Sequence, residues 1–91
     1  MVLMAPQLVL IDRLARAHLI RDTFARSPLF RKAAVSEPVL TPGGEVTLNV
    51  SFDGGPTVFR VVAGSEGEAY AVLHELALDM VEIERSHEAR R

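Results

Sequence analysis

The chain has 91 residues, of which 48% are hydrophobic and 24% charged, and its formal net charge at pH 7 is −2. A chain of this length forms one domain, 1–91, and this composition is typical of a globular protein. Because it has no cysteine, a disulfide framework, a thiolate metal site and a cysteine nucleophile are excluded. We expect a cytoplasmic protein, since the apolar start is too short to cross a bilayer and lacks the features of a signal peptide.

The charge is unevenly distributed along the chain. Residues 1–36 carry six basic and two acidic residues, a net charge of +4, whereas 37–91 carry ten acids and four arginines, a net charge of −6. Such asymmetry indicates either that the halves pair with each other, within the fold or across a symmetric dimer, or that the basic half binds an acidic partner. We expect pairing between the halves.

The first predicted element is a helix over 7–26, with Pro6 in its first turn. Apolar residues at helical spacing predict the face turned toward the core; they are Leu10, Leu14, Ala17 and Phe24, with Ile11 and Ala25 beside them. The opposite face is expected to be exposed to solvent and carries Asp12, Arg16, Thr23 and Arg26. Ser27-Pro28 breaks this helix, because proline disfavours helical geometry in the residue before it.

The middle of the chain predicts a small antiparallel sheet. Pro38 limits 35–40 to a candidate edge strand. Residues 45–63 then read as a β-hairpin around Asp53-Gly54-Gly55-Pro56, a turn suited to positive φ. The first hairpin strand has one wholly apolar and one wholly polar face, so we expect the sheet to be covered on one side only. On the second strand, Val58 and Val62 are expected to face outward.

The last predicted element is a helix over 65–86, followed by a polar tail, 87–91. Ser65 is a good N-cap, and Glu68 stands at the capping-box spacing. Two apolar stripes follow at helical spacing: Ala69, Leu73, Leu76, Met80 and Ile83 in the first, and Tyr70, Ala77, Leu78 and Val81, with His74 among them, in the second. The first stripe is expected to lie on the sheet. The second is covered either by the N-terminal helix or by another chain.

These elements predict an α+β fold in the order helix, candidate edge strand, hairpin, helix. Both helices would pack on the apolar face of a small antiparallel sheet. This order resembles that of a double-stranded RNA-binding domain, and Gly64-Ser65-Glu66-Gly67-Glu68-Ala69 falls where that family opens its last helix. The resemblance covers 45 to about 76 and rests on topology and a few small residues. It argues against RNA binding, because Glu66 and Glu68 stand where the family's lysines contact phosphates.

Motifs that carry chemistry are absent or weak. Glu84-x-x-His87 has the spacing of a di-metal ligand pair, but the sequence has no second copy of it. His18 and His74 lie on separate elements from His87, so we predict neither a metal site nor a cofactor. No serine has a nucleophile-elbow setting, and no glycine pair has the lysine of a phosphate-binding loop. The protein is therefore not expected to be an enzyme.

The surplus of apolar side chains predicts a protein-interaction module that self-associates or binds another protein. The predicted interface residues are Tyr70, His74, Leu78 and Val81 on the helix, and Val58 and Val62 on the sheet. An adaptor, a chaperone-like holder, an immunity protein and an inhibitor such as a phage uses against host defence all fit. The alternative is a nucleic-acid-associated regulator that uses the basic residues Arg13, Arg16, Arg26, Arg31 and Lys32. Membrane binding by the basic N-terminal helix ranks below both, because the core needs the apolar residues of that helix.

Overall fold

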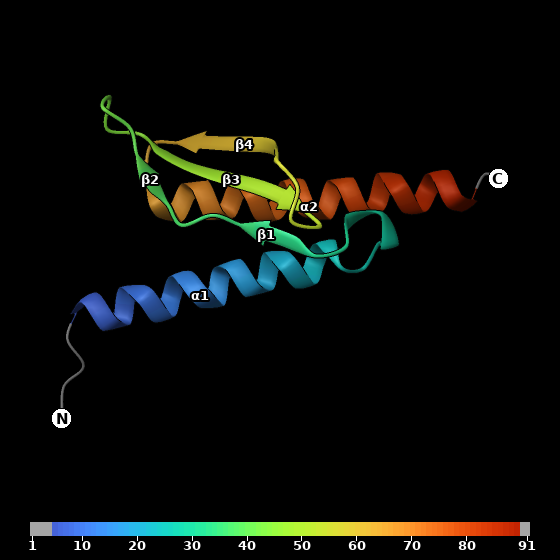
Figure 1. Ribbon diagram of the computed structural model, residues 1–91, viewed down its shortest axis with the longest axis horizontal. Helices are drawn as coiled ribbons and strands as arrows, with labels where there is room; N and C mark the ends of the chain where they lie inside the picture. The colour runs from blue at the N-terminus through green and yellow to red at the C-terminus, as the bar shows by residue number, and fades with distance from the viewer. Residues whose placement is uncertain (1–4, 90–91) are drawn as a thin grey trace.

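The computed structural model describes the backbone of residues 5–89 and the side chains of 11–87. Two long helices flank a small antiparallel sheet (Figure 1). The elements are α1 (Ala5–Phe24), a 3-10 turn η1 (Pro28–Phe30), β1 (Ala33–Val35), β2 (Val39–Leu40), β3 (Val46–Phe52), β4 (Thr57–Ala63) and α2 (Glu66–Ala89). The predicted α+β class and the order of helices and strands are confirmed. The first helix ends two residues earlier than predicted, and α2 continues into the predicted polar tail, of which 90–91 lie outside the described residues.

The sheet is built around β3. Strand β4 pairs with one side of β3, while β1 and β2 share the other side, β1 on the C-terminal half and β2 on the N-terminal half. The candidate edge strand is therefore two short strands. Pro38, which has no N–H to donate, stands between them. Before this break, the backbone of Ser36 donates to the carbonyl of Asn49 (2.9 Å), and the Ser36 hydroxyl accepts from the Asn49 N–H (2.9 Å).

The turn between β3 and β4 needs left-handed backbone. Asp53 has φ 55° and Gly54 has φ 70°, a region that glycine and aspartate tolerate better than most residues. At Gly55 the constraint is space, because an added Cβ would lie 3.1 Å from the Phe52 carbonyl oxygen. The hairpin turn lies where the pattern predicted it, but positive φ occurs at Asp53 and Gly54 and not at both glycines of the pair.

The core lies between the helices and the inner face of the sheet. Phe24, in the last turn of α1, is fully buried. The other three phenylalanines of the chain, Phe30, Phe52 and Phe59, surround its ring with centroids 5.4–6.0 Å away. Such aromatic contacts stabilise beyond the area they bury. The aromatic cluster therefore joins α1, η1 and the hairpin.

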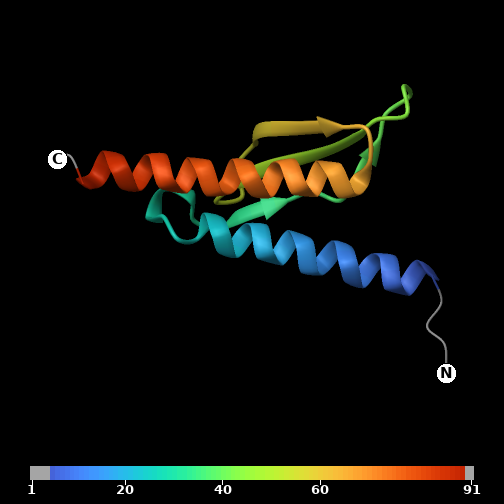
Figure 2. The ribbon, with the colours of Figure 1, turned by 180° about the vertical axis from the view of Figure 1, so that it is seen from behind.

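The buried face of α1 matches the predicted one at Phe24 but not at Ile11 and Leu14. Ile20, Thr23 and Phe24 are buried, whereas Leu14 is 62% and Ile11 is 56% exposed. Thr23, predicted to be wet, can be buried because its hydroxyl donates to the Leu19 carbonyl (2.9 Å). Toward its N-terminus α1 diverges from the rest of the molecule (Figures 1 and 2), so its apolar stripe is left uncovered there. The side chain of Leu10 lies outside the described residues.

Helix α2 covers the sheet and also contacts α1. Seen from behind, it lies across the sheet with α1 beside it (Figure 2). Tyr70, Ala77 and Val81 are buried and α1 packs against α2, so the chain itself covers most of the second stripe. Ile83, predicted to lie on the sheet, is 61% exposed, because the C-terminal turns of α2 extend past the sheet (Figure 1).

The two helix ends give the molecule an elongated shape. Its radius of gyration is 14.6 Å and its extents are 53 × 34 × 22 Å, whereas a compact domain of this length has a radius of gyration of about 12 Å. The excess length consists of helix that the sheet does not cover.

Candidate protein-interaction surfaces

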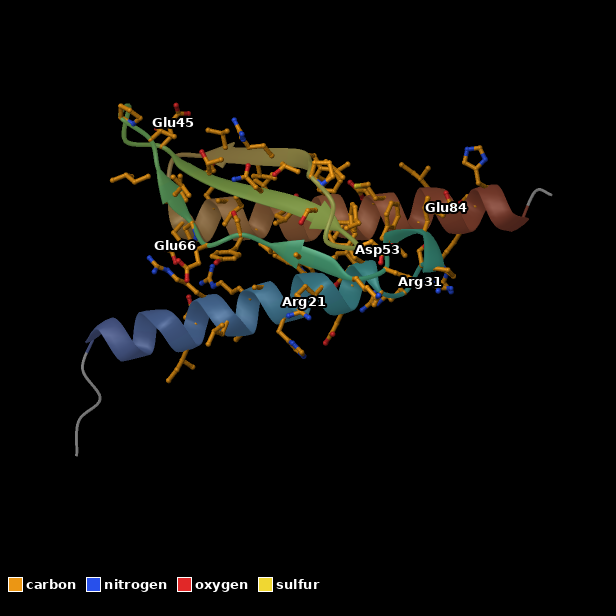
Figure 3. All side chains as sticks on the ribbon, viewed as in Figure 1. Arg21, Arg31, Glu45, Asp53, Glu66 and Glu84 are labelled. Carbon is orange, nitrogen blue, oxygen red and sulfur yellow. The ribbon has the colours of Figure 1, made fainter. Side chains whose placement is uncertain are left out.

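An open groove of about 890 Å³ lies between α1 and β1 and is named here the α1–β1 groove. Its lining residues are Leu14, Ala15, Ala17, His18 and Arg21 from the helix and Lys32, Ala33, Ala34 and Val35 from the strand. Figure 3 marks Arg21 on α1, with Arg31 and Asp53 toward the C-terminal end of the helix. Six lining side chains are apolar and three are basic, and no acidic side chain is among them.

The strand side of the groove is an unpaired edge. The Lys32 carbonyl accepts from the Asp53 N–H (3.3 Å), and the Ser36 N–H donates to the Asn49 carbonyl, so these residues direct their backbone groups toward β3. Bonding direction alternates along an antiparallel ladder. The backbone N–H and C=O of Ala33 and Val35 therefore point away from β3, and no strand pairs with them in the described part of the chain.

The outer face of the sheet is a second exposed surface. The sheet register aligns Val39, Thr47 and Val62 across three strands. The valines are 53% and 50% exposed, and between them Thr47 is buried. Val58, further along β4, is 59% exposed. As predicted, Val58 and Val62 face outward from a sheet that helices cover on the other side.

The structure separates the predicted interface residues of the last helix. Tyr70 and Val81 are 3% and 4% exposed, so the expectation that they form free surface is wrong. His74 is half-buried, and Leu78 is 38% exposed. Leu78 and Val81 line a shallow pocket of about 460 Å³ that also includes Arg26, Glu82 and Arg85. Of Tyr70, Leu78 and Val81, the apolar residues predicted to form the interface on this helix, only Leu78 is substantially exposed.

Tyr70 belongs to a small polar junction between the helices. Arg13 donates to Glu66 through Nε (2.6 Å) and Nη2 (2.9 Å), and the Arg16 guanidinium lies 5.8 Å from the centre of the Tyr70 ring. The Arg13 hydrogen bond holds the pKa of the Glu66 carboxyl below its ordinary value. Burial raises the pKa of the Tyr70 hydroxyl. This junction ties the basic first helix to the acidic last helix, so it contributes to the fold.

The predicted nucleic-acid contacts are mostly engaged within the chain. Arg13 binds Glu66, Arg16 binds Asp12 (2.9 Å) and Lys32 lies 3.8 Å from Asp53. Arg26 and Arg31 are exposed, and no ion pair links either one to another described residue. Only the Arg13–Glu66 pair joins the two helices, so most of the charge asymmetry is not neutralised by direct contact within residues 11–87.

Among the residues described, no group of three or more His, Cys, Asp or Glu side chains is placed to hold a metal ion. His18 contacts Asp22 (3.4 Å) on α1, and His87 is exposed near the other end of the molecule. Within 5–89, neither helix has a stretch both long and apolar enough to span a membrane. Comparisons with protein-family models, curated proteins and solved structures found no match.

Sequence reasoning missed the α1–β1 groove because it assigned the α1 stripe to the core. The spacing of a second set of residues could have indicated which face of α1 is buried. Ala17, Ile20, Phe24 and Ser27 recur at steps of three and four, the spacing of a helix face, and Ser27 is also buried. The apolar stripe with Leu14, by contrast, has His18 and Arg21 beside it, an unfavourable composition for a core.

Proposed function

We propose that this protein is a small, non-enzymatic, cytoplasmic module that binds other proteins through exposed apolar surface and also self-associates. The observation that carries the proposal is the exposure of Ile11 and Leu14 beside the α1–β1 groove. A soluble monomer rarely leaves contiguous apolar surface uncovered, and large exposed patches mark interaction sites. Adaptor, inhibitor and immunity-type roles, including phage-encoded inhibition of host defence, all use binding of this kind.

The outer face of the sheet supports the same proposal independently. Val39, Val58 and Val62 are each at least half exposed, and β-branched residues on a flat sheet face form a surface suited to packing against another protein. Leu78 adds an apolar residue on α2. The pairing of Arg13 with Glu66 through two hydrogen bonds supports protein binding over nucleic-acid binding, because it occupies one of the predicted nucleic-acid contacts.

The test is quantitative co-purification from the cell that produces the protein. Tagged wild type is compared with Leu14→Glu and with the double variant Val58→Glu/Val62→Glu. Leu19→Glu is the matched control, because Leu19 is 50% exposed on α1 and is not part of the α1–β1 groove lining. We expect at least one protein to be retained by wild type and control and lost from a surface variant. Identical protein sets for all four, or retention of nucleic acid alone, would contradict the proposal.

A further inference from the structure

We infer that the α1–β1 groove accepts an extended segment of a partner protein as an added strand on β1, and that this segment alternates apolar and acidic residues. The inference rests on the proposed function and specifies one binding mode for it. Two independent features of the groove carry it: its unpaired strand edge and its side-chain chemistry.

The strand edge supplies the hydrogen bonds. Ala33 and Val35 each direct one N–H and one C=O toward the groove, so an added strand can form up to four backbone hydrogen bonds there. Extended peptides commonly bind by extending an exposed sheet edge in this way, with backbone bonds giving affinity and side-chain pockets giving specificity. Edge strands are usually blunted by a charge, a proline or a covering element. Along Ala33–Val35 the sequence has neither charge nor proline.

Helix α1 provides the apolar surface on which the added strand would pack. Ala33 is buried and Val35 is partly buried against the core, so this face of β1 is turned toward the helices. Alternate side chains of an added strand would continue this face and meet Leu14 and Ala17. The apolar stripe of α1 is suited to packing against a sheet. The described sheet ends at β1, and an added strand beside β1 would cover the part of this stripe that is now exposed.

The charge of the groove selects an acidic occupant. His18, Arg21 and Lys32 line it, and no acidic residue does. His18 contacts Asp22 at 3.4 Å and Lys32 contacts Asp53 at 3.8 Å, but all four side chains are at least 66% exposed. Such exposed contacts are weak, so a ligand carboxylate can compete for the Lys32 ammonium and for the His18 ring. The segment is therefore expected to carry Asp or Glu between its apolar residues.

The direct test is an NMR titration of the isotopically labelled full chain. The probe is a capped peptide in which valine and glutamate alternate. We expect shift changes at the amides of Ala33 and Val35 and at the side chains of Leu14 and Ala17. Leu14→Glu should weaken binding about tenfold or more, because it removes apolar contact surface and adds a charge of the same sign as the peptide glutamates. The Leu19→Glu variant should bind the peptide like wild type.

Two further peptides identify the binding mode. A peptide N-methylated at alternate residues lacks the N–H donors along one edge, and its methyl groups obstruct close approach to β1, so it should not bind. A valine–lysine peptide should bind more weakly than the glutamate peptide, and Arg21→Glu should reverse that order. The inference is overturned by no shift changes at millimolar peptide, by changes centred on Val58 and Val62, or by equal binding of the N-methylated peptide.

Dilution of the protein without peptide tests a rival occupant. If the shifts of Ala33, Val35 and Leu14 depend on protein concentration, a second copy fills the groove and the peptide inference is wrong. Failure of the inference is distinguishable from failure of the proposed function. Partners lost from the Val58→Glu/Val62→Glu variant would uphold protein binding even if the groove bound no strand.

Discussion

At the scale of single residues, the packing of Phe24 decides how α1 is held. Its ring lies against three other aromatic rings and is inaccessible to water. We predict that Phe24→Ala lowers the free energy of unfolding by about 3–5 kcal/mol, the usual cost of removing a buried aromatic side chain. Urea denaturation followed by circular dichroism measures this. Leu14→Ala is the control and should cost much less, since Leu14 is 62% exposed. Equal losses would show that Leu14 belongs to the core.

The Arg13–Glu66 pair makes part of the stability depend on pH. The pKa of Glu66 is lowered in the folded protein, mainly by the hydrogen bond from Arg13. A group with a depressed folded pKa stabilises above its unfolded pKa, and this contribution disappears as the pH falls through the folded value. Unfolding measurements on wild type should therefore show that the free energy of unfolding begins to fall near pH 4.5, the ordinary pKa of a glutamate, and falls further at lower pH.

Glu66→Gln should remove that part of the acid-induced loss, because glutamine does not titrate. Glu82→Gln is the matched control, since Glu82 is an exposed acid on the same helix with no ion pair to another described residue. In the control, the free energy of unfolding should differ between neutral and acid pH by as much as in wild type. If both variants gave the same pH profile, the salt bridge would have no role in stability.

At the scale of elements, α2 contains a correctable weakness in its first turn. Gly67 lies inside the helix, where glycine costs about 1 kcal/mol relative to alanine. A Cβ placed there would have Arg16 Nη1 as its nearest neighbour at 3.6 Å, an ordinary contact with a flexible side chain. We predict that Gly67→Ala raises the free energy of unfolding by about 0.5–1 kcal/mol, measured by thermal or urea denaturation. A loss of stability would contradict the helical placement of this residue.

Leu78 and Val81 separate surface from core on the same helix. Val81 is 4% exposed, so Val81→Glu buries a charge without a partner and should lower stability by about 3 kcal/mol or more. Leu78 is 38% exposed, so Leu78→Glu should cost about 1 kcal/mol or less. Thermal denaturation of the two single variants checks this. If both were equally tolerated, α1 would not cover this part of α2.

The sequence predicted the hairpin and the last helix well because local signals agree there. Alternation along 46–52, the Asp-Gly-Gly turn and the Ser65 cap all favour the same structure, and the outward placement of Val58 and Val62 followed from the alternation. The orientation of α1 could not be predicted in the same way. It depends on where Phe24 inserts between α2 and the hairpin, a tertiary contact that overrides the apolar stripe containing Leu14.

The candidate site was only partly predictable for the same reason. The register that places Val62 on the outer face is local, whereas Tyr70 and Val81 are buried by a helix distant in sequence. The edge of β1 is unpaired because no further strand lies on that side among the described residues. The α1–β1 groove and its basic lining could not be predicted, because both depend on the position of α1 relative to β1.

At the scale of the whole molecule, the exposed outer sheet face predicts self-association. The mean mass measured by light scattering after size exclusion should rise above 10.0 kDa as the protein concentration increases. Val58→Glu/Val62→Glu should remain at the monomer mass, because like charges would then face each other across a symmetric contact. A wild-type protein that stays monomeric at high micromolar concentration would contradict self-association and leave other proteins as the partners.

The central claim is that the exposed apolar residues contact other proteins in the cell. Photo-crosslinking tests it most directly, with a photoreactive phenylalanine derivative replacing Leu14, Val62 or, as the control, the exposed acid Asp79 of α2. We predict protein adducts from positions 14 and 62 and none from position 79, with the adduct mass separating a second copy from another protein. No adducts at all, or the same adducts from all three positions, would contradict the claim.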